Sequence, residues 1–318
     1  MPDTPLFRLS FAFAAGAVMA FSAQARAQAQ IPKCPVTHDQ LVNALKQSVK
    51  ASGGPSNGGL PVNEWAAVVN RHGVVCAVAY SGKKATSQWP GSRAIAVEKA
   101  NTVNGFGLDK YAISTANLYA QAQPGGFLYG TYLGNPPVAK ELYAGKETDY
   151  GTKSDPLIGK KPGGVIVFGG GLGLYNKQGI VGGLGASGNT SCADHNIAWR
   201  VRKKLGLDHV PNGPSPQHND EIIYDIGKNG KSESGWGHPE CGHNAPQIAQ
   251  KIGAGIVKVA QGGEAPSATQ GAGAAERRQA TASSKGRAAD QDHAAYSNSN
   301  LTPQRTPAHA STLPRSMQ

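Results

Sequence analysis

The sequence is poor in acidic side chains, lacks a paired-cysteine motif and has no second long apolar run. Lysine and arginine number 31 against 20 aspartate and glutamate residues, which gives a formal net charge of +11. The basic residues are not interleaved with aromatic residues, so nucleic acid is not expected as a partner. The four cysteines include no Cys-x-x-Cys pair, which argues against a thioredoxin-like site. Beyond residue 21 no apolar stretch could cross a bilayer, so stable membrane insertion is not expected.

The N-terminal segment has the pattern of an export signal. Arg8 precedes an apolar stretch, Leu9 to Phe21, that is too short to span a membrane of about 30 Å. Small residues at 25–29 then offer a cleavage site. We therefore predict a signal peptide over residues 1–29 and a periplasmic or secreted protein. An uncleaved anchor is the alternative.

The C-terminal segment has almost no large apolar residues. Residues 262–318 consist mainly of Ala, Gly, Ser, Thr, Pro and Gln with scattered charges. Such a composition buries too little surface to offset the entropy lost on ordering. We predict a disordered tail there, which leaves residues 30–261 as one domain.

The four cysteines predict disulfides, since an even number in an exported chain favours pairing. Three pairings are open. We favour Cys34–Cys76 with Cys192–Cys241, because these bonds would join each end of the domain to its middle.

The pattern of the domain predicts an α+β fold, an antiparallel sheet flanked by helices. Thr37 and Gln40 fit a capping box before a helix, and Trp65–Val69 and Val74–Tyr80 read as the strands of a hairpin. A helix from Ser92, an insertion over about 107–161, a second hairpin and a closing helix follow. The second hairpin is expected to include Val165-Ile166-Val167. An extension over about 207–260 adds a strand at 222–226 and a helix near 248–259.

The densest motif lies in the second hairpin, where Gly183-Leu184-Gly185-Ala186-Ser187-Gly188 satisfies G-x-G-x-x-G. A dinucleotide fingerprint needs a parallel strand after the helix, which the remaining chain does not offer. Ser187 does not sit in the G-x-S-x-G of a nucleophile elbow. Backbone without side chains admits either a packed segment or the edge of a ligand, and the sequence leaves both open.

Histidines and acids provide the remaining candidates. The segment His238–His243 holds two histidines, a glutamate and a cysteine, but its spacing matches no common zinc pattern. Asp194 and His195 follow Cys192 at the start of the closing helix. His38 and His72 are expected in cap and turn positions, where each is also a candidate axial haem ligand.

Three segments carry a resemblance to a known family. They are the hairpin 65–75, the helix from Ser92 to Phe106 with Lys99 and Ala100 in an A-x-x-K-A pattern, and the run from Gly179 to Gly188 followed by Asp194 and Ala198. These resemble the GlcG/HbpS family of haem-binding proteins, which includes the C-terminal domain of PduO. The resemblance covers most of residues 36–206. It implies a profilin-like layered fold, assembly into a homo-oligomer, and a haem or related tetrapyrrole partner.

The chain departs from that family in its insertion, its extension and its cysteines, and it has no E-x-x-E iron pair. Our main hypothesis is an exported haem-binding protein with haem as cofactor, in uptake, sequestration or degradation. The candidate cofactor-binding residues are Gly183, Gly185, Ser187, Gly188, His195, His38 and His72. The alternatives are a structural or accessory protein, and an enzyme acting on a small metabolite through Ser187, His195 and a carboxylate.

Overall fold

The core is a four-stranded antiparallel sheet. The computed structural model describes residues 33–258, so the predicted signal peptide and the predicted tail lie outside the described residues. The strands follow the order β2-β1-β4-β3. Their bounds are β1 Trp65–Asn70, β2 Val75–Tyr80, β3 Gly171–Asn176 and β4 Gly179–Ser187. The predicted α+β class and the first hairpin are therefore confirmed.

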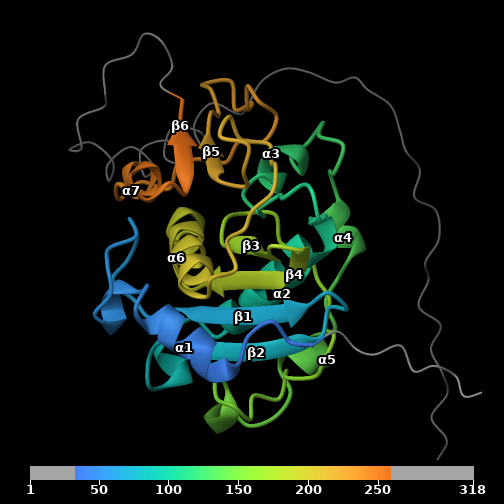
Figure 1. Ribbon diagram of the computed structural model, residues 1–318, viewed down its shortest axis with the longest axis vertical. Helices are drawn as coiled ribbons and strands as arrows, with labels where there is room; N and C mark the ends of the chain where they lie inside the picture. Colours follow the sequence, from blue (N-terminus) through green and yellow to red (C-terminus); the bar gives the residue numbers. More distant parts are fainter. Residues whose placement is uncertain (1–32, 259–318) are drawn as a thin grey trace, which may run out of the picture. The chain divides into compact units, whose positions relative to one another are not determined.

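Helices cover both faces of this sheet (Figure 1). On one face lie α1, His38–Lys46, and α6, Ser191–Lys204, while α2, Gly91–Phe106, packs on the other. The short 3-10 helices are Lys50–Ser52, Ala85–Ser87 and Glu147–Asp149. None of the helices in the described part has the length and apolar character of a membrane span.

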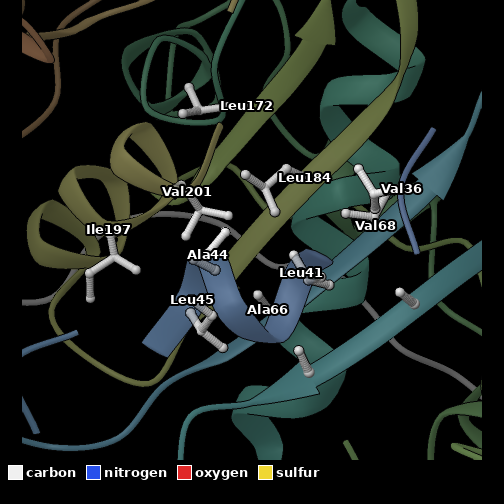
Figure 2. Close-up of a cluster of buried hydrophobic side chains, with 14 of the residues drawn as sticks. Val36, Leu41, Ala44, Leu45, Ala66, Val68, Leu172, Leu184, Ile197 and Val201 are labelled. Carbon is white, nitrogen blue, oxygen red and sulfur yellow. The ribbon is translucent and has the colours of Figure 1, made fainter. Parts of the chain in front are cut away.

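The larger core lies under α1 and α6 (Figure 2). Alternate residues of β1 serve different faces: Ala66 and Val68 point toward α1 and α6, while Trp65, Ala67 and Val69 belong to the cluster under α2. This is the period of two expected for a strand buried on both faces. The main apolar contacts of the first cluster come from Leu41, Leu45, Leu172, Leu184, Ile197 and Val201.

The predicted capping box is present at the start of α1. The Thr37 hydroxyl accepts the N–H of Gln40 at 3.3 Å, and the Gln40 side chain accepts the N–H of Thr37 at 2.8 Å. Two backbone donors that no helical carbonyl reaches are thereby satisfied.

The insertion contains α3, Leu118–Gln121, α4, Thr131–Gly134, and α5, Ala139–Leu142. The fully buried guanidinium of Arg93 on α2 pairs with Asp155 and donates to the carbonyl of Leu142 at 2.7 Å. Leu142 and Leu157 join the core under α2. The insertion is thus packed into the domain.

The extension holds β5, Ile222–Tyr224, α7, Ala245–Ile252, and β6, Gly255–Val257. The strands β5 and β6 pair in parallel as a second sheet. The helix expected near 248–259 starts earlier and stops at Ile252, because Gly253 adopts φ +69° and ends it. Arg202 of α6 and Asp220 form a buried ion pair at 2.6 Å that ties the extension to the core.

The expectation of a strand at Val165-Ile166-Val167 is wrong. Ile166 donates its N–H to Thr102 of α2 at 2.9 Å, and Asn101 of α2 donates to the carbonyl of Gly164 at 2.8 Å. This run is therefore bound along α2. The glycine-rich β3 forms the sheet edge instead, where it pairs antiparallel with β4.

Both favoured disulfides are present in the structure. Cys34–Cys76 joins the segment before α1 to β2, and Cys192–Cys241 joins α6 to the extension. Neither pairing leaves a free cysteine among the described residues.

Candidate functional site

A buried cluster of charged side chains lies where β4 leads into α6. Lys99 of α2 has no exposed surface, and its Nζ is 2.6 Å from Asp194 Oδ2 and 3.0 Å from the Ala186 carbonyl oxygen. Asp194 stands in the first turn of α6, and its Oδ1 accepts the N–H of Asn189 at 2.8 Å. A carboxylate at this position is also favoured by the positive end of the helix. The cluster joins α2, β4 and α6.

Glu64, directly before β1, is the third member of this cluster. Its side chain is fully buried, and no N–H of the described residues donates a hydrogen bond to either carboxyl oxygen. Burial and then the negative charge of Asp194 hold the pKa of Glu64 well above its usual range. A protonated Glu64 leaves one cation and one anion in the cluster, which balances its charge.

The glycines of the G-x-G-x-x-G run pack against α2. A Cβ on Gly183 would lie 2.1 Å from the Ala100 carbonyl oxygen, and one on Gly185 would lie 1.9 Å from that of Ala96. The space beside these two glycines is therefore filled by helix backbone. Of the two interpretations that the sequence left open here, close packing is the one that the geometry fits.

Gly188 has a different role at the end of β4. Its φ of +146° is rarely adopted by residues with a side chain, and a Cβ there would meet Gln88 at 2.9 Å and Glu64 at 3.0 Å. Gln88 donates to the Gly188 carbonyl at 3.0 Å. Gly188 thus covers the buried carboxyl of Glu64.

His195 is a buried residue of α6. Its Nε2–H donates to the Ala254 carbonyl at 3.1 Å, whereas Nδ1 has no partner among the described residues. Burial lowers the pKa of His195 to about 3, so the ring is neutral. Ser187 is buried too, and in the described part of the chain no hydrogen bond joins it to His195. The hydroxyl–imidazole pair required by the enzyme alternative is therefore not assembled.

His38 and His72 have contrasting surroundings. His38 Nε2–H donates to the Gly151 carbonyl at 2.9 Å, so this ring holds the insertion against α1. His72 lies exposed in the turn between β1 and β2. Of the three predicted histidines, His72 alone presents an exposed ring.

A surface groove of about 390 Å³ lies between the loop after β2 and the insertion. Its lining includes Tyr80, Lys83, Lys84 and Tyr150. Arg93 lies 3.8 Å above the Tyr150 ring and supports it from inside. The volume suits a small ligand, and two lysines against one carboxylate, that of Glu147, favour an anionic one.

The sequence patterns include Lys99 and Asp194 but do not assign them to a site, and they do not indicate Glu64. One signal was available for Lys99, because it lies among Ala96, Ala100 and Val103 on the apolar side of α2. A cation in such a position requires a buried counter-ion. Nothing local marks Glu64, whose burial depends on β1 and β4 meeting.

The buried histidines predict acid lability. In the folded protein His195 has a pKa of about 3 and stays neutral, whereas in the unfolded chain it takes up a proton near pH 6.5. The contribution of the buried ring to the free energy of unfolding is therefore present above pH 6.5 and is lost as the pH falls. Between pH 7 and pH 4.5, we expect the free energy of unfolding to fall by about 2 kcal/mol less in His195→Gln than in the wild type. Urea unfolding at both values measures this, with exposed His209→Gln as control. Equal losses in wild type and His195→Gln would contradict the assignment.

Comparison with known proteins identifies the family. A family model described as haem-degrading protein HbpS-like matches residues 37–202, which is more than half of the chain. The chain belongs to this HbpS-like family. The matched region contains the sheet, α1, α2 and nearly all of α6, while the extension lies beyond it. The resemblance predicted from the sequence is confirmed.

Solved structures with similarity to this HbpS-like chain include a complex of PduOC with haem. It is 23% identical in sequence, the match covers 52% of this chain and 89% of that chain, and the TM-score is 0.36. The structure of Klebsiella pneumoniae protein ORFY is 20% identical, with 54% of this chain and 90% of that chain covered and a TM-score of 0.36. A structure of HbpS is 18% identical, with 57% of this chain and 98% of that chain covered and a TM-score of 0.34. No curated protein matched the chain.

Proposed function

We propose that this HbpS-like chain is an exported, homo-oligomeric haem-binding protein that serves haem uptake, sequestration or degradation. Its membership of a haem-degrading family, matched over residues 37–202, carries the proposal. The two disulfides of the described domain support a location in an oxidising compartment. When bound, haem would supply the iron chemistry.

His72 is our proposed iron ligand. Its exposed ring leaves a nitrogen accessible, whereas His195 is buried and His38 is held by Gly151. The Val75 N–H donates to the Lys160 carbonyl at 2.9 Å, which places this lysine near the same turn. Lys160 and Lys161 are exposed cations that suit haem propionates. The glycines at 183 and 185 do not fit a ligand, since α2 fills the space beside them.

A hemin titration of the purified protein tests both parts of the proposal. We expect a saturable shift of the Soret band in the wild type and at least a tenfold loss of affinity in His72→Ala. The control is His209→Ala, an exposed histidine beside β3 at the opposite sheet edge.

The outcomes separate the parts. No saturable shift in the wild type would overturn haem binding. Unchanged binding in His72→Ala would overturn the ligand assignment alone. Weakened binding in the double variant Lys83→Ala, Lys84→Ala, with His72→Ala unaffected, would move the haem to the groove near Tyr80.

A further inference from the structure

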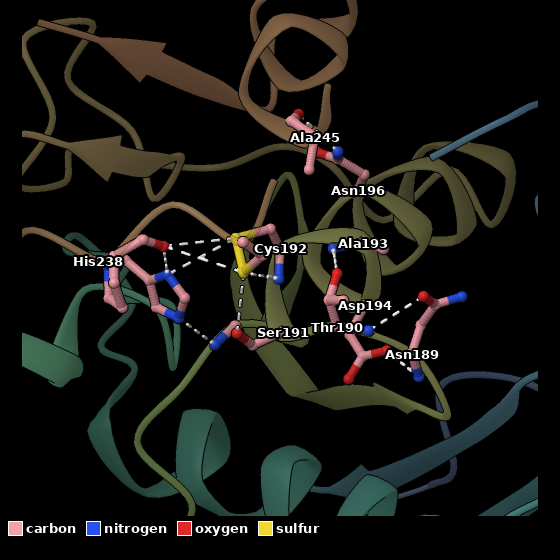
Figure 3. The surroundings of a disulfide bond; sticks show 12 residues. Asn189, Thr190, Ser191, Cys192, Ala193, Asp194, Asn196, His238 and Ala245 are labelled. Atoms are coloured by element: carbon pink, nitrogen blue, oxygen red, sulfur yellow. Dashed lines mark hydrogen bonds between the residues drawn. A yellow bond between two sulfur atoms is a disulfide. The ribbon is translucent and has the colours of Figure 1, made fainter. Parts of the chain in front are cut away.

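The Cys192–Cys241 disulfide has a buried histidine beside it (Figure 3). His238 is 1% exposed, and its Nδ1 lies 3.9 Å from Cys192 Sγ. The ligand atoms of Cys192, His238 and Cys241 all lie within 4.8 Å of one another. Two thiolates and an imidazole are zinc ligands, so a reduced form of this group first suggests a metal site.

The hydrogen bonds of His238 argue against a metal. Its Nε2 accepts the N–H of Gly169 at 3.2 Å, and a nitrogen that accepts a hydrogen bond carries no proton. Nδ1 lies 2.7 Å from the Pro239 carbonyl oxygen, which can only accept, so Nδ1 carries the proton. The nitrogen that faces Cys192 is thus a donor. Burial lowers the pKa of His238 to about 4, which keeps the ring neutral.

The two sulfur atoms differ in access and in surroundings. Cys192 is fully buried in the first turn of α6, whereas Cys241 is only partly buried. An external thiolate therefore reaches Cys241 more readily, and Cys192 becomes the leaving group. A thiolate on Cys192 would have the Nδ1–H of His238 as a neighbour at 3.9 Å, which it would share with the Pro239 carbonyl. The positive end of α6 favours a thiolate on either sulfur, since the Cys192 N–H donates to Cys241 Sγ at 3.2 Å.

The domain has contacts that would outlast the loss of this bond. Asn196 donates to the Ala245 carbonyl at 3.1 Å, and His195 donates to that of Ala254. An apolar cluster also joins the extension to α6, with Ile222, Tyr224, Ala249 and Ala254 among its buried members. Opening the disulfide therefore leaves the extension bound to α6.

We propose that Cys192–Cys241 is an exchangeable disulfide and that His238 is the positioning residue that stabilises its reduced form. The thiolate of a dithiol reductant attacks Cys241 Sγ, the S–S bond breaks, and its electron pair goes to Cys192. The second thiol of the reductant then displaces Cys241 from the mixed disulfide. The reductant ends as a disulfide, and its two electrons and two protons end on the two cysteines.

The other disulfide of the chain is the internal reference for the test. Among the described residues no hydrogen bond joins a histidine to Cys34–Cys76, and Cys34 is exposed. The protein would be equilibrated with reduced and oxidised dithiothreitol at graded ratios. Each cysteine would then be alkylated and quantified by mass spectrometry.

We expect Cys192–Cys241 to be half-reduced at a ratio of reduced to oxidised dithiothreitol at least tenfold lower than the ratio that half-reduces Cys34–Cys76. A tenfold difference in this ratio corresponds to about 30 mV in reduction potential. His238→Phe keeps a ring of similar size but removes the donor, and should shrink this difference at least threefold. His238→Asn places an amide N–H near the position of Nδ1 and should restore most of it. Cys34–Cys76 should not change in either variant.

Two results would overturn the proposal. The first, which is measured on the wild type alone, is that Cys192–Cys241 is reduced no more readily than Cys34–Cys76. The other is a folded His238→Phe protein with an unchanged difference between the two disulfides.

Discussion

Asp194→Asn is expected to lower the free energy of unfolding by about 3–5 kcal/mol, because it removes the carboxylate that pairs with the buried charge of Lys99. Lys99 Nζ lies 2.6 Å from the carboxylate that the substitution removes, and the ammonium group has no exposed surface. Its remaining acceptor, the Ala186 carbonyl oxygen at 3.0 Å, is neutral. Either the lysine then loses its proton or Glu64, the other carboxyl of the cluster, ionises in the core, and both cost stability.

Urea unfolding followed by circular dichroism measures this effect. The matched control is Asp39→Asn, which breaks the exposed pair of Asp39 with Lys153 at 2.7 Å, where both side chains are more than 60% exposed. That variant should hardly change stability, since exposed ion pairs contribute little. If Asp194→Asn costs no more stability than Asp39→Asn, the Lys99–Asp194 pair does not support the fold.

A double replacement separates the cost of an unpaired charge from the value of the pair. Lys99→Met with Asp194→Leu removes both charges and keeps similar volumes. We expect it to recover most of the stability lost in Asp194→Asn, since well-packed apolar residues often replace a buried ion pair at little cost. A double variant as unstable as Asp194→Asn would mean that the hydrogen bond from the Asn189 N–H to the Asp194 carboxylate matters more than its charge.

Gly185→Ala is expected to destabilise the domain by at least about 3 kcal/mol, at the upper end for overpacking. The added methyl group would lie 1.9 Å from the Ala96 carbonyl oxygen and 2.7 Å from the Ala100 backbone nitrogen. Both atoms belong to the backbone of α2, so no side chain can rotate to make room. The helix must move off the sheet, and Lys99 would move with it.

The matched control is Gly105→Ala within α2. A Cβ there meets nothing within 4 Å, and the φ of Gly105 is not positive. Alanine loses less entropy than glycine in a helix, so this variant should gain up to about 1 kcal/mol. Thermal unfolding compares the two proteins. A Gly185→Ala protein as stable as the wild type would show that α2 does not contact β4 this closely.

These two substitutions test one arrangement. The glycines of β4 allow α2 to approach the sheet, and that approach carries Lys99 to Asp194 at the start of α6. The run that matches a dinucleotide fingerprint by its letters is therefore a packing surface, and the helix after it contributes a buried carboxylate.

Several features could be predicted from neighbouring residues. The capping box at Thr37 and Gln40 and the first hairpin depend on contacts a few residues apart, so the sequence pattern indicates them directly. Val165–Val167 is the counterexample. Its β-branched residues favour a strand, but hydrogen bonds to Asn101 and Thr102 hold the run along α2.

The sequence by itself determined the α+β class, the first antiparallel hairpin and the family of this protein, because each depends on patterns within short segments. Only the tertiary structure decided which side chains form the buried site. Lys99 and Asp194 are 95 residues apart, and His238 is 69 residues from the Gly169 N–H that determines which ring nitrogen carries its proton. Such contacts depend on how α2, β4 and the extension pack together. No local pattern encodes this, because burial and charge pairing arise only when distant segments meet.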